Sequence, residues 1–247
     1  SGVTCAIIEL GLFYILSKTM YQYGNLNRIN PIAYYWMTFT VLVGIWEYVY
    51  VSDRQTPSLE AKKLIKNNRH VWTSYYPISM VLPWNLSRHF YAEYGAWADR
   101  EYQNTKNHWS RMIEGSHELC CGFFSLLTIL FKIYGQDEKY ILCAGISMGT
   151  QFMNSLLYMG EYFIQVEEKD SVNYDRKEFP AGNFLLKRPF MWINIFWFLI
   201  PVLLGFSFFS KQAPTVYVIF LITILSIIFF LKLKNISNFM YAFTGVI

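Results

Sequence analysis

The sequence is poor in charge. Asp, Glu, Lys and Arg make up 15% of its 247 residues, against roughly 25% in an average soluble domain. Hydrophobic residues reach 54% and aromatic residues 19%. A soluble chain of this length could bury a core without so much apolar surface. The composition therefore argues against an ordinary soluble domain and predicts a membrane protein with several spans.

Signals of metal or nucleic-acid chemistry are also scarce. The sequence has four cysteines, Cys5, Cys120, Cys121 and Cys143. They fall in apolar segments without metal-ligand or disulfide spacing, and we interpret them as small buried hydrophobes. Glu114 and His117 form an E-x-x-H motif, which is half of a di-iron pattern, but no second copy occurs. The net charge of +4 is spread over loops. We therefore expect no metal, no cofactor and no nucleic-acid partner.

Long apolar runs are abundant. A helix needs about 20 largely apolar residues to cross the roughly 30 Å hydrocarbon core of a bilayer. Five segments meet this requirement well: 32–51, 112–134, 140–164, 189–209 and 215–231. Residues 4–23 form a weaker sixth, because Glu9 and Lys18 interrupt the apolar run. We expect an all-α transmembrane helical bundle of about six spans.

The longest polar region, 52–111, lies between the predicted spans 32–51 and 112–134. It contains a predicted surface helix, SLEAKKLIKNN, and a Trp- and Tyr-rich stretch that is typical of a bilayer interface. A smaller polar loop covers 165–188. With six spans, most Lys and Arg residues fall on the side of both termini and these two loops. The positive-inside rule places that side in the cytoplasm or its equivalent.

Glutamates inside the predicted spans are the main functional signal. Five lie within or at the edge of a span: Glu9, Glu47, Glu114, Glu118 and Glu161. A charge at the bilayer centre costs about 2.5–3.5 kcal/mol on insertion scales, so such residues usually face the bundle interior and mark a site. Helical spacing places Glu114, His117 and Cys121 on one face of the predicted span 112–134, with Glu118 one turn from Glu114.

Two further spans carry polar side chains at helical spacing. The predicted span 140–164 carries Asn154, Tyr158 and Glu161 at i, i+4, i+7. In the predicted span 189–209, Asn194 and Trp197 are about one turn apart. Polar stripes on three helices of an apolar wall indicate an enclosed cavity with a few placed polar groups. The alternative is helix–helix hydrogen bonding that only holds the bundle together.

The order of these motifs resembles the emopamil-binding protein family, also called the EXPERA domain, which includes sterol delta8–delta7 isomerase and the sigma-2 receptor. The similar stretches are WEYVY at 46–50, EYGAWADR at 93–100, IEGSHELCCGFFSLL at 113–127, GTQFMNSLLYMGE at 149–161 and NIFWFLIP at 194–201. The resemblance implies an EXPERA-like membrane domain over 32–210. It leaves a first, weaker span and short loop over 1–31, and an additional span and tail over 211–247.

The resemblance implies a sterol isomerase that moves a ring double bond from delta8 to delta7 by protonation and deprotonation. Glu114 matches the carboxylate that works on the double bond, and Glu47 matches its partner. The chain departs from the pattern at Val43, where the isomerase has a histidine, and at His117, where it has a threonine. We hypothesise that His117 supplies the missing histidine from the neighbouring helix, which makes it the third candidate catalytic residue.

The remaining candidate residues would contact the substrate. They are Trp197, Asn194, Asn154, Tyr158, Glu161 and Glu118. The expected partners are the lipid bilayer and a sterol or other hydrophobic small molecule, with a homodimer or larger membrane complex as a further option. The endoplasmic reticulum membrane is the expected location. Two alternatives stay open: a non-catalytic sterol or lipid binder, and an accessory subunit of a larger complex, for which the mitochondrial inner membrane is the expected location.

Overall fold

The computed structural model describes residues 1–24, 26–174 and 190–209. Within these ranges the chain is helical and contains no strand, which confirms the all-α fold class. The predicted last span, 215–231, lies outside the described residues. The chain divides into two compact units, Ser1–Ser147 and Met148–Ile247, and each is described by itself.

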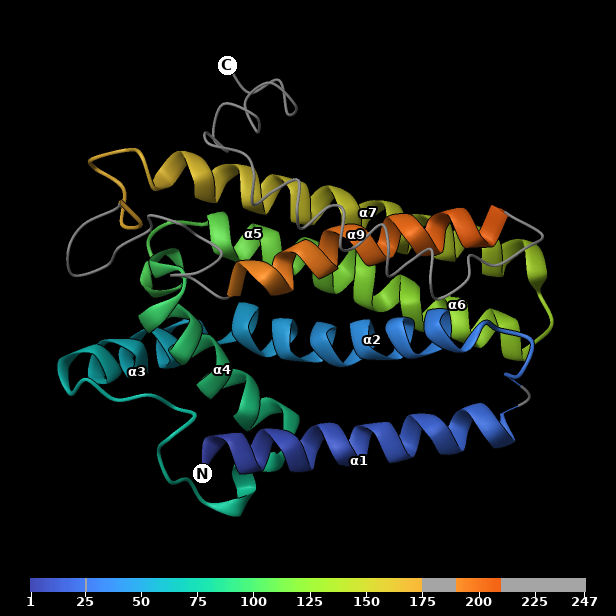
Figure 1. The fold of residues 1–247 in the computed structure, drawn as a ribbon, viewed down its shortest axis with the longest axis horizontal. Coiled ribbons are helices and arrows are strands. Elements are labelled where there is room, and N and C mark those ends of the chain that lie inside the picture. Colours follow the sequence, from blue (N-terminus) through green and yellow to red (C-terminus); the bar gives the residue numbers. More distant parts are fainter. Residues whose placement is uncertain (25, 175–189, 210–247) are drawn as a thin grey trace. The chain divides into compact units, whose positions relative to one another are not determined.

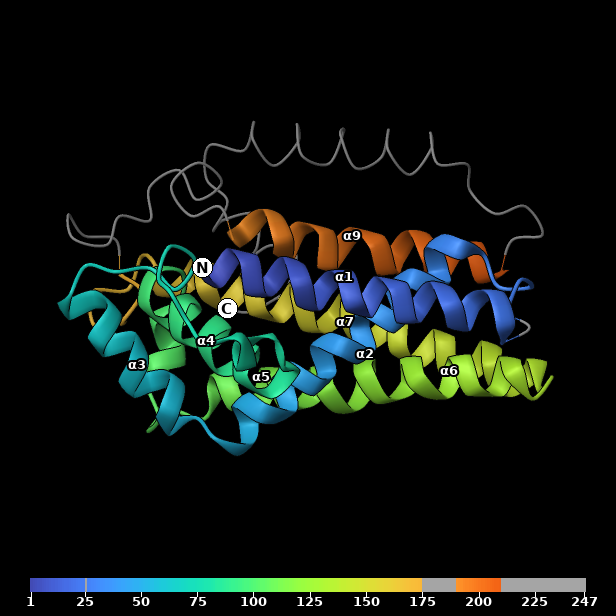
Figure 2. The ribbon, with the colours of Figure 1, turned by 90° about the horizontal axis from the view of Figure 1, so that it is seen from below.

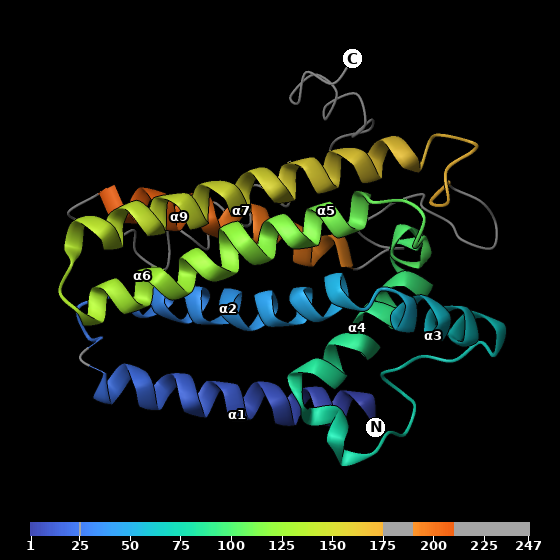
Figure 3. The ribbon, with the colours of Figure 1, turned by 180° about the vertical axis from the view of Figure 1, so that it is seen from behind.

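Three long antiparallel helical segments form the frame of the first unit (Figure 1, Figure 3). They are α1 (Gly2–Tyr23), α2 (Pro31–Ser52) and a continuous segment made of α5 (Trp109–Ser116), a π-helical turn (His117–Phe123) and α6 (Phe124–Ile133). The continuous segment packs along α2 over all three of its parts. This interface is where the candidate site lies.

Local sequence signals set where two of the helices begin. The Asn30 side chain caps α2 by accepting a hydrogen bond from the backbone N–H of Ile32 at 2.9 Å, and Pro31 occupies the first helical position. Both features are typical of helix N-termini, because the cap satisfies a free N–H and proline has none to satisfy. The helix α4 (Pro83–Trp97) likewise begins at a proline.

The polar region 52–111 folds against one end of this frame, where α1 begins and α2 ends (Figure 2). It forms α3 (Gln55–Lys66), the short 3₁₀ helices η1 (Ile78–Val81) and η2 (Arg100–Gln103), and α4. The helix α4 packs on α2, α3 and η2. The region expected to be an interfacial loop is therefore largely helical, and part of it is core.

The turn between α2 and α3 is fixed by Asp53. Its Oδ1 accepts hydrogen bonds from the backbone N–H and the hydroxyl of Thr56 at 3.3 and 3.0 Å, and its Oδ2 pairs with Arg88 Nε at 3.1 Å. Partial burial acts to raise the pKa of Asp53. The hydrogen bonds from Thr56 and the charge of Arg88 outweigh that effect and hold the pKa below its usual value.

The helix α1 turns its apolar side chains outward. Ile7, Leu12, Ile15 and Leu16 are 59–65% exposed. The buried residues of the helix are Gly2, Cys5, Glu9 and Ser17. A surface helix of a soluble protein shows the opposite pattern, with apolar residues inward and polar residues outward. The side-chain arrangement of α1 is therefore the one that a lipid environment favours.

Two helices among the described residues are long and apolar enough to cross a membrane, α1 and the segment Trp109–Ile133; Ile193–Gly205 is a shorter apolar helix. The predicted spans 32–51 and 140–164 are helical but do not meet the same criterion. Length and composition do not separate such helices from the core helix of a soluble protein or from a signal sequence. The six-span bundle therefore stays a prediction.

The second unit contains most of α7 (Asp137–Gln165), which begins in the first unit, and α9 (Phe190–Phe209). Aromatic rings join these two helices. The ring centroids of Phe152 and Phe198 lie 4.8 Å apart, and Tyr162 meets Phe190 edge-on at 5.4 Å. These contacts stabilise the pairing of α7 with α9.

Candidate functional site

Three of the predicted site residues meet where α2 packs on the continuous segment. Glu47 lies near the end of α2, Glu114 lies in α5, and His117 is the first residue of the π-helical turn. Their exposed fractions are 4%, 9% and 6%. Buried ionisable groups are costly unless they pair with one another, so their convergence is the main feature of the unit.

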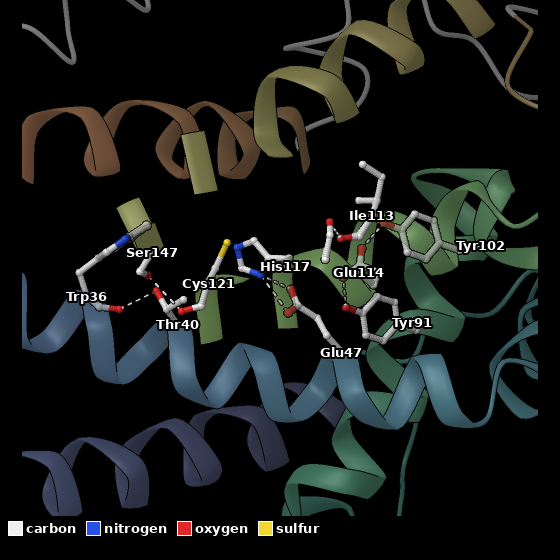
Figure 4. Close-up of polar contacts among 11 residues, drawn as sticks. Trp36, Thr40, Glu47, Tyr91, Tyr102, Ile113, Glu114, His117, Cys121 and Ser147 are labelled. Atoms are coloured by element: carbon white, nitrogen blue, oxygen red, sulfur yellow. Dashed lines mark hydrogen bonds and ion pairs between the residues drawn. The ribbon is translucent and has the colours of Figure 1, made fainter. Parts of the chain in front are cut away.

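His117 and Glu47 form a direct pair across the helix interface. His117 Nδ1 lies 2.7 Å from Glu47 Oε1 and 2.9 Å from Oε2. A proton between the ring nitrogen and the carboxyl group therefore has partners on both sides. The other edge of the imidazole faces the thiol of Cys121, one turn further along the same segment (Figure 4).

Glu114 is held by two phenols. Tyr91 of α4 donates a hydrogen bond to Glu114 Oε2 at 2.7 Å, and Tyr102 of η2 donates to Oε1 (Figure 4). Burial raises the pKa of Tyr91 well above its usual value, and the neighbouring carboxyl groups raise it further. Tyr91 therefore keeps its proton and acts as a donor. Glu114 has a hydrogen-bond donor on each oxygen, which suits an ionised carboxylate.

The Glu114 side chain lies beside Glu47 (Figure 4), near enough for its charge to act on the Glu47 carboxyl group. His117, Glu47, Glu114 and the two tyrosines thus lie together, and we call them the acid–histidine cluster (Figure 4). Two ionised carboxylates at this separation repel strongly in a dry interior. The cluster is therefore expected to retain a proton on the Glu47–His117 side while Glu114 accepts hydrogen bonds. Such a group can both give a proton and take one.

A contact between two glycines brings these helices together. A Cβ atom on Gly122 would lie 3.1 Å from the Cα atom of Gly44, and a Cβ on Gly44 would lie 3.2 Å from the Cα of Gly122. Only hydrogen atoms fit between the two backbones. Gly44 precedes Glu47 by about one turn, so the close approach helps the Glu47 carboxyl group to reach His117.

The π-helical turn is held from α7. Ser147 Oγ donates to the carbonyl oxygen of Cys121 at 3.0 Å (Figure 4). The same oxygen lies 2.7 Å from Ser125 Oγ. All three residues are buried. Turns of π-helix within α-helices occur frequently at functional sites, because they change the direction of side chains on either side. Here the turn begins at His117 itself.

Glu118 is the fourth predicted site residue of this unit. It is half-buried and lies near enough for its charge to act on Glu47. Among the described residues, no hydrogen bond joins Glu118 to the acid–histidine cluster, so it lies at the edge of the site.

The other predicted substrate contacts belong to the second unit. Glu161 Oε1 accepts a hydrogen bond from Gln165 Nε2 at 2.9 Å, so this glutamate takes part in a polar contact at the end of α7. Asn194 Nδ2 donates to the carbonyl of Phe190 within α9 at 3.2 Å. Tyr158 is buried, and Asn154 and Trp197 are half-buried. Their convergence on the acid–histidine cluster stays a prediction.

Sequence reasoning missed Tyr91 and Tyr102. Both lie in the region that the composition assigned to the bilayer interface, and both reach Glu114 only because α4 and η2 fold back onto α2. One signal was present, since Tyr102 closely follows the Asp99–Arg100 pair of the EYGAWADR motif. Cys121 was interpreted as a small buried hydrophobe, and its thiol proves to face His117 (Figure 4).

The chain matches no protein-family profile, no curated protein and no solved structure. The resemblance to the emopamil-binding protein family therefore rests on the motifs alone. Among the described residues, no group of three or more His, Cys, Asp or Glu side chains is placed to hold a metal ion.

Proposed function

We propose that the chain is a polytopic membrane protein that shifts a ring double bond of a sterol, from delta8 to delta7, at the acid–histidine cluster. One observation carries the proposal: the buried Glu47–His117 pair lies beside Glu114, whose two oxygens accept hydrogen bonds from Tyr91 and Tyr102. Double-bond migration needs a group that gives a proton and a group that takes one, close together in an apolar setting.

The outward face of the frame supports a lipid environment. The apolar side chains of α1 are exposed while Glu9 is buried. The continuous segment also exposes Met112, Leu119 and Phe123, at 68%, 59% and 49%, while it buries Glu114 and His117. Membrane helices typically expose apolar side chains to lipid and bury their ionisable side chains, since intramembrane charges face the interior of the bundle.

The proposed reaction begins at the Glu47–His117 pair. Its stored proton is transferred to one carbon of the ring double bond, whose π electrons form the new C–H bond. A tertiary carbocation remains on the other carbon. The Glu114 carboxylate stabilises this cation, because an ionised group in a dry, preorganised site acts strongly on developing charge.

The second half of the reaction takes a proton away. A C–H bond next to the cation breaks, its electrons form the new double bond, and the proton goes to Glu114. Release of that proton to solvent, and uptake of a new one by the Glu47–His117 pair, restore the starting state. No proton is gained or lost overall. The sterol as substrate comes from the resemblance, which also predicts that Trp197 and Asn194 face the cation.

The test is turnover by the purified full-length chain in lipid nanodiscs, supplied with a delta8 sterol in D₂O. We expect the delta7 sterol with one deuterium from solvent, detected by mass spectrometry. Glu47→Gln and Glu114→Gln should each lower the rate by about 10²–10⁴-fold, the usual contribution of a positioned acid or base. The matched control is Glu9→Gln, an equally buried glutamate outside the cluster, which should turn over normally.

Two variants of His117 separate a proton carrier from a structural hydrogen bond. His117→Asn can keep a donor near Glu47 but cannot hold a mobile proton, whereas His117→Ala removes both. If His117 carries the proton, both variants lose activity. Full turnover by His117→Asn would contradict that role. Sterol binding without any product from the unaltered chain would contradict catalysis and identify a sterol binder.

A further inference from the structure

A basic surface lies at the end of the first unit, outside the predicted spans. Lys62, Lys63 and Lys66 of α3 and the following Arg69 are exposed. Lys63 pairs with Glu60 at 3.2 Å. Among the described residues, Lys62, Lys66 and Arg69 have no ion-pair partner. The surface therefore presents several uncompensated positive charges within a short stretch of chain.

An apolar strip follows directly in the sequence. Its exposed members are Tyr75, Ile78, Leu82 and Trp84, at 90%, 73%, 41% and 49%. The chain just before them is joined to the start of α1, because the backbone N–H groups of Gly2 and Val3 donate to the carbonyls of Ser74 and Trp72 at 2.9 and 3.2 Å. The strip thus lies beside the first turn of the helix whose apolar side chains point outward.

The connection between the basic and apolar parts is held in place by α4. Glu93 Oε2 of α4 accepts a hydrogen bond from the backbone N–H of Val71 at 2.8 Å, and Glu93 Oε1 lies 2.7 Å from His70 Nδ1. Trp97 Nε1 donates to the carbonyl of Arg69 at 3.2 Å. These bonds fix the loop before it meets any partner, and a preordered surface binds at lower entropic cost.

We propose that residues 62–84 form a membrane-binding surface. Its basic part, Lys62, Lys66 and Arg69, contacts anionic phospholipid headgroups. Its apolar part inserts the side chains of Tyr75, Ile78 and Trp84 at the bilayer interface. The proposal rests on the membrane part of the proposed function but not on the reaction. Anionic lipid attracts basic residues next to a span, and Trp and Tyr settle at the headgroup level.

A bilayer fits this surface better than an acidic protein does. An acidic protein would satisfy the lysines, but its charged face would not accommodate the neighbouring apolar strip. The headgroup region offers negative charge, and the acyl boundary just below it takes apolar side chains. A bilayer therefore binds both the basic residues and the apolar strip of this surface.

The experiment places the environment-sensitive fluorophore NBD at position 78. The Ile78→Cys variant of the full-length chain is labelled and placed in nanodiscs of phosphatidylcholine, with or without phosphatidylserine. The unsubstituted chain measures labelling of the native cysteines, of which Cys5, Cys121 and Cys143 are buried. We expect blue-shifted, brighter emission as phosphatidylserine is added, reversed by high salt because screening weakens the attraction.

Charge variants sharpen the result. The triple variant Lys62→Gln, Lys66→Gln, Arg69→Gln should need several-fold more phosphatidylserine for the same emission change, because each Lys or Arg near an anionic surface contributes about fivefold. The matched control is Lys139→Gln, an exposed lysine at the other end of the first unit, which should leave the response unchanged.

The outcomes separate this proposal from the membrane assignment itself. A second probe at Ile15→Cys lies on the outward face of α1 and reports whether that helix is in lipid. Lipid-like emission at position 15 with water-like emission at position 78 would overturn the membrane-binding surface alone. A response to phosphatidylserine that the triple variant retains would also overturn it. Water-like emission at position 15 would overturn the membrane assignment.

Discussion

The first unit contains two buried glutamate sites that look alike in the sequence but differ in the structure. In the acid–histidine cluster, Glu114 has a donor on each oxygen, and both oxygens of Glu47 lie within 2.9 Å of His117 Nδ1. In α1, Glu9 is equally buried, but only its Oε1 has a partner, the indole N–H of Trp46 at 3.0 Å. Its Oε2 is buried without a hydrogen-bond partner among the described residues.

The difference shows what makes a buried glutamate a candidate for chemistry. An ionised carboxylate in a dry interior needs donors on both oxygens, and a bare buried oxygen costs about 1–3 kcal/mol or more when charged. The cluster meets that need and adds an imidazole that can carry a proton. The Glu9–Trp46 pair does not meet it, so we interpret that pair as an anchor between α1 and α2.

Removing both phenols from Glu114 should have the largest effect. In the double variant Tyr91→Phe, Tyr102→Phe, the carboxylate loses its two donors. Hydrogen bonds to charged groups contribute about 1.5–3 kcal/mol each, so we expect turnover of a delta8 sterol to fall by on the order of 10²-fold or more. Rates in nanodiscs and the thermal midpoint of unfolding measure the two consequences.

The matched control for this pair is Tyr48→Phe. Tyr48 is next to Glu47 in α2 but points outward and is 59% exposed. Its rate and its midpoint should equal those of the unsubstituted chain. Normal turnover by the double variant would show that Glu114 does not need the phenols, and the distinction between the two glutamate sites would fail.

The glycine contact should give an intermediate effect. In Gly122→Ala the new methyl group would lie 3.1 Å from the Cα of Gly44, so the backbones must separate by some tenths of an ångström. We expect a loss of about 1–3 kcal/mol in stability, as for overpacked cores, and a lower rate because Glu47 moves away from His117.

A glycine of the same unit provides the comparison for this change. A Cβ on Gly145 in α7 would meet nothing within 4 Å. Gly145→Ala should therefore be neutral or stabilise by up to about 1 kcal/mol, the usual gain from alanine within a helix. Equal midpoints for the two alanine variants would mean that the close contact of α2 with the π-helical turn has no energetic role.

The sequence was sufficient to predict the helices and part of the cluster. Apolar runs placed α1, α2, α7 and α9 within a few residues of their observed bounds. Glu114 and His117 share one helix face, and the chain has Val43 where the isomerase pattern has a histidine. Together these two features led to the hypothesis that His117 replaces that histidine. The observed contact between His117 and Glu47 is consistent with this hypothesis.

The remaining features depend on tertiary contacts that no local pattern carries. The phenols of Tyr91 and Tyr102 come from a polar, aromatic region whose composition suits an interface, and only the packing of α4 on α2 brings them inward. The π-helical turn at His117 has no capping or spacing signal in the sequence. The bare oxygen of Glu9 likewise follows from what surrounds it, since its sequence setting resembles that of Glu47.

The smallest effects are expected at the Glu9–Trp46 pair. Glu9→Gln keeps an oxygen for the indole N–H and replaces the bare oxygen with an amide of similar size. Since no described neighbour bonds to that oxygen, stability should change by less than about 1 kcal/mol. Trp46→Phe removes the donor and should cost about 0.5–1.5 kcal/mol, the net value of one hydrogen bond, plus lost packing against Phe90.

Sterol turnover should stay normal in Glu9→Gln, because this glutamate shares no hydrogen bond with the acid–histidine cluster. A large rate loss there, at an unchanged thermal midpoint, would show that proton chemistry extends to α1 and that a single donor is enough to support it.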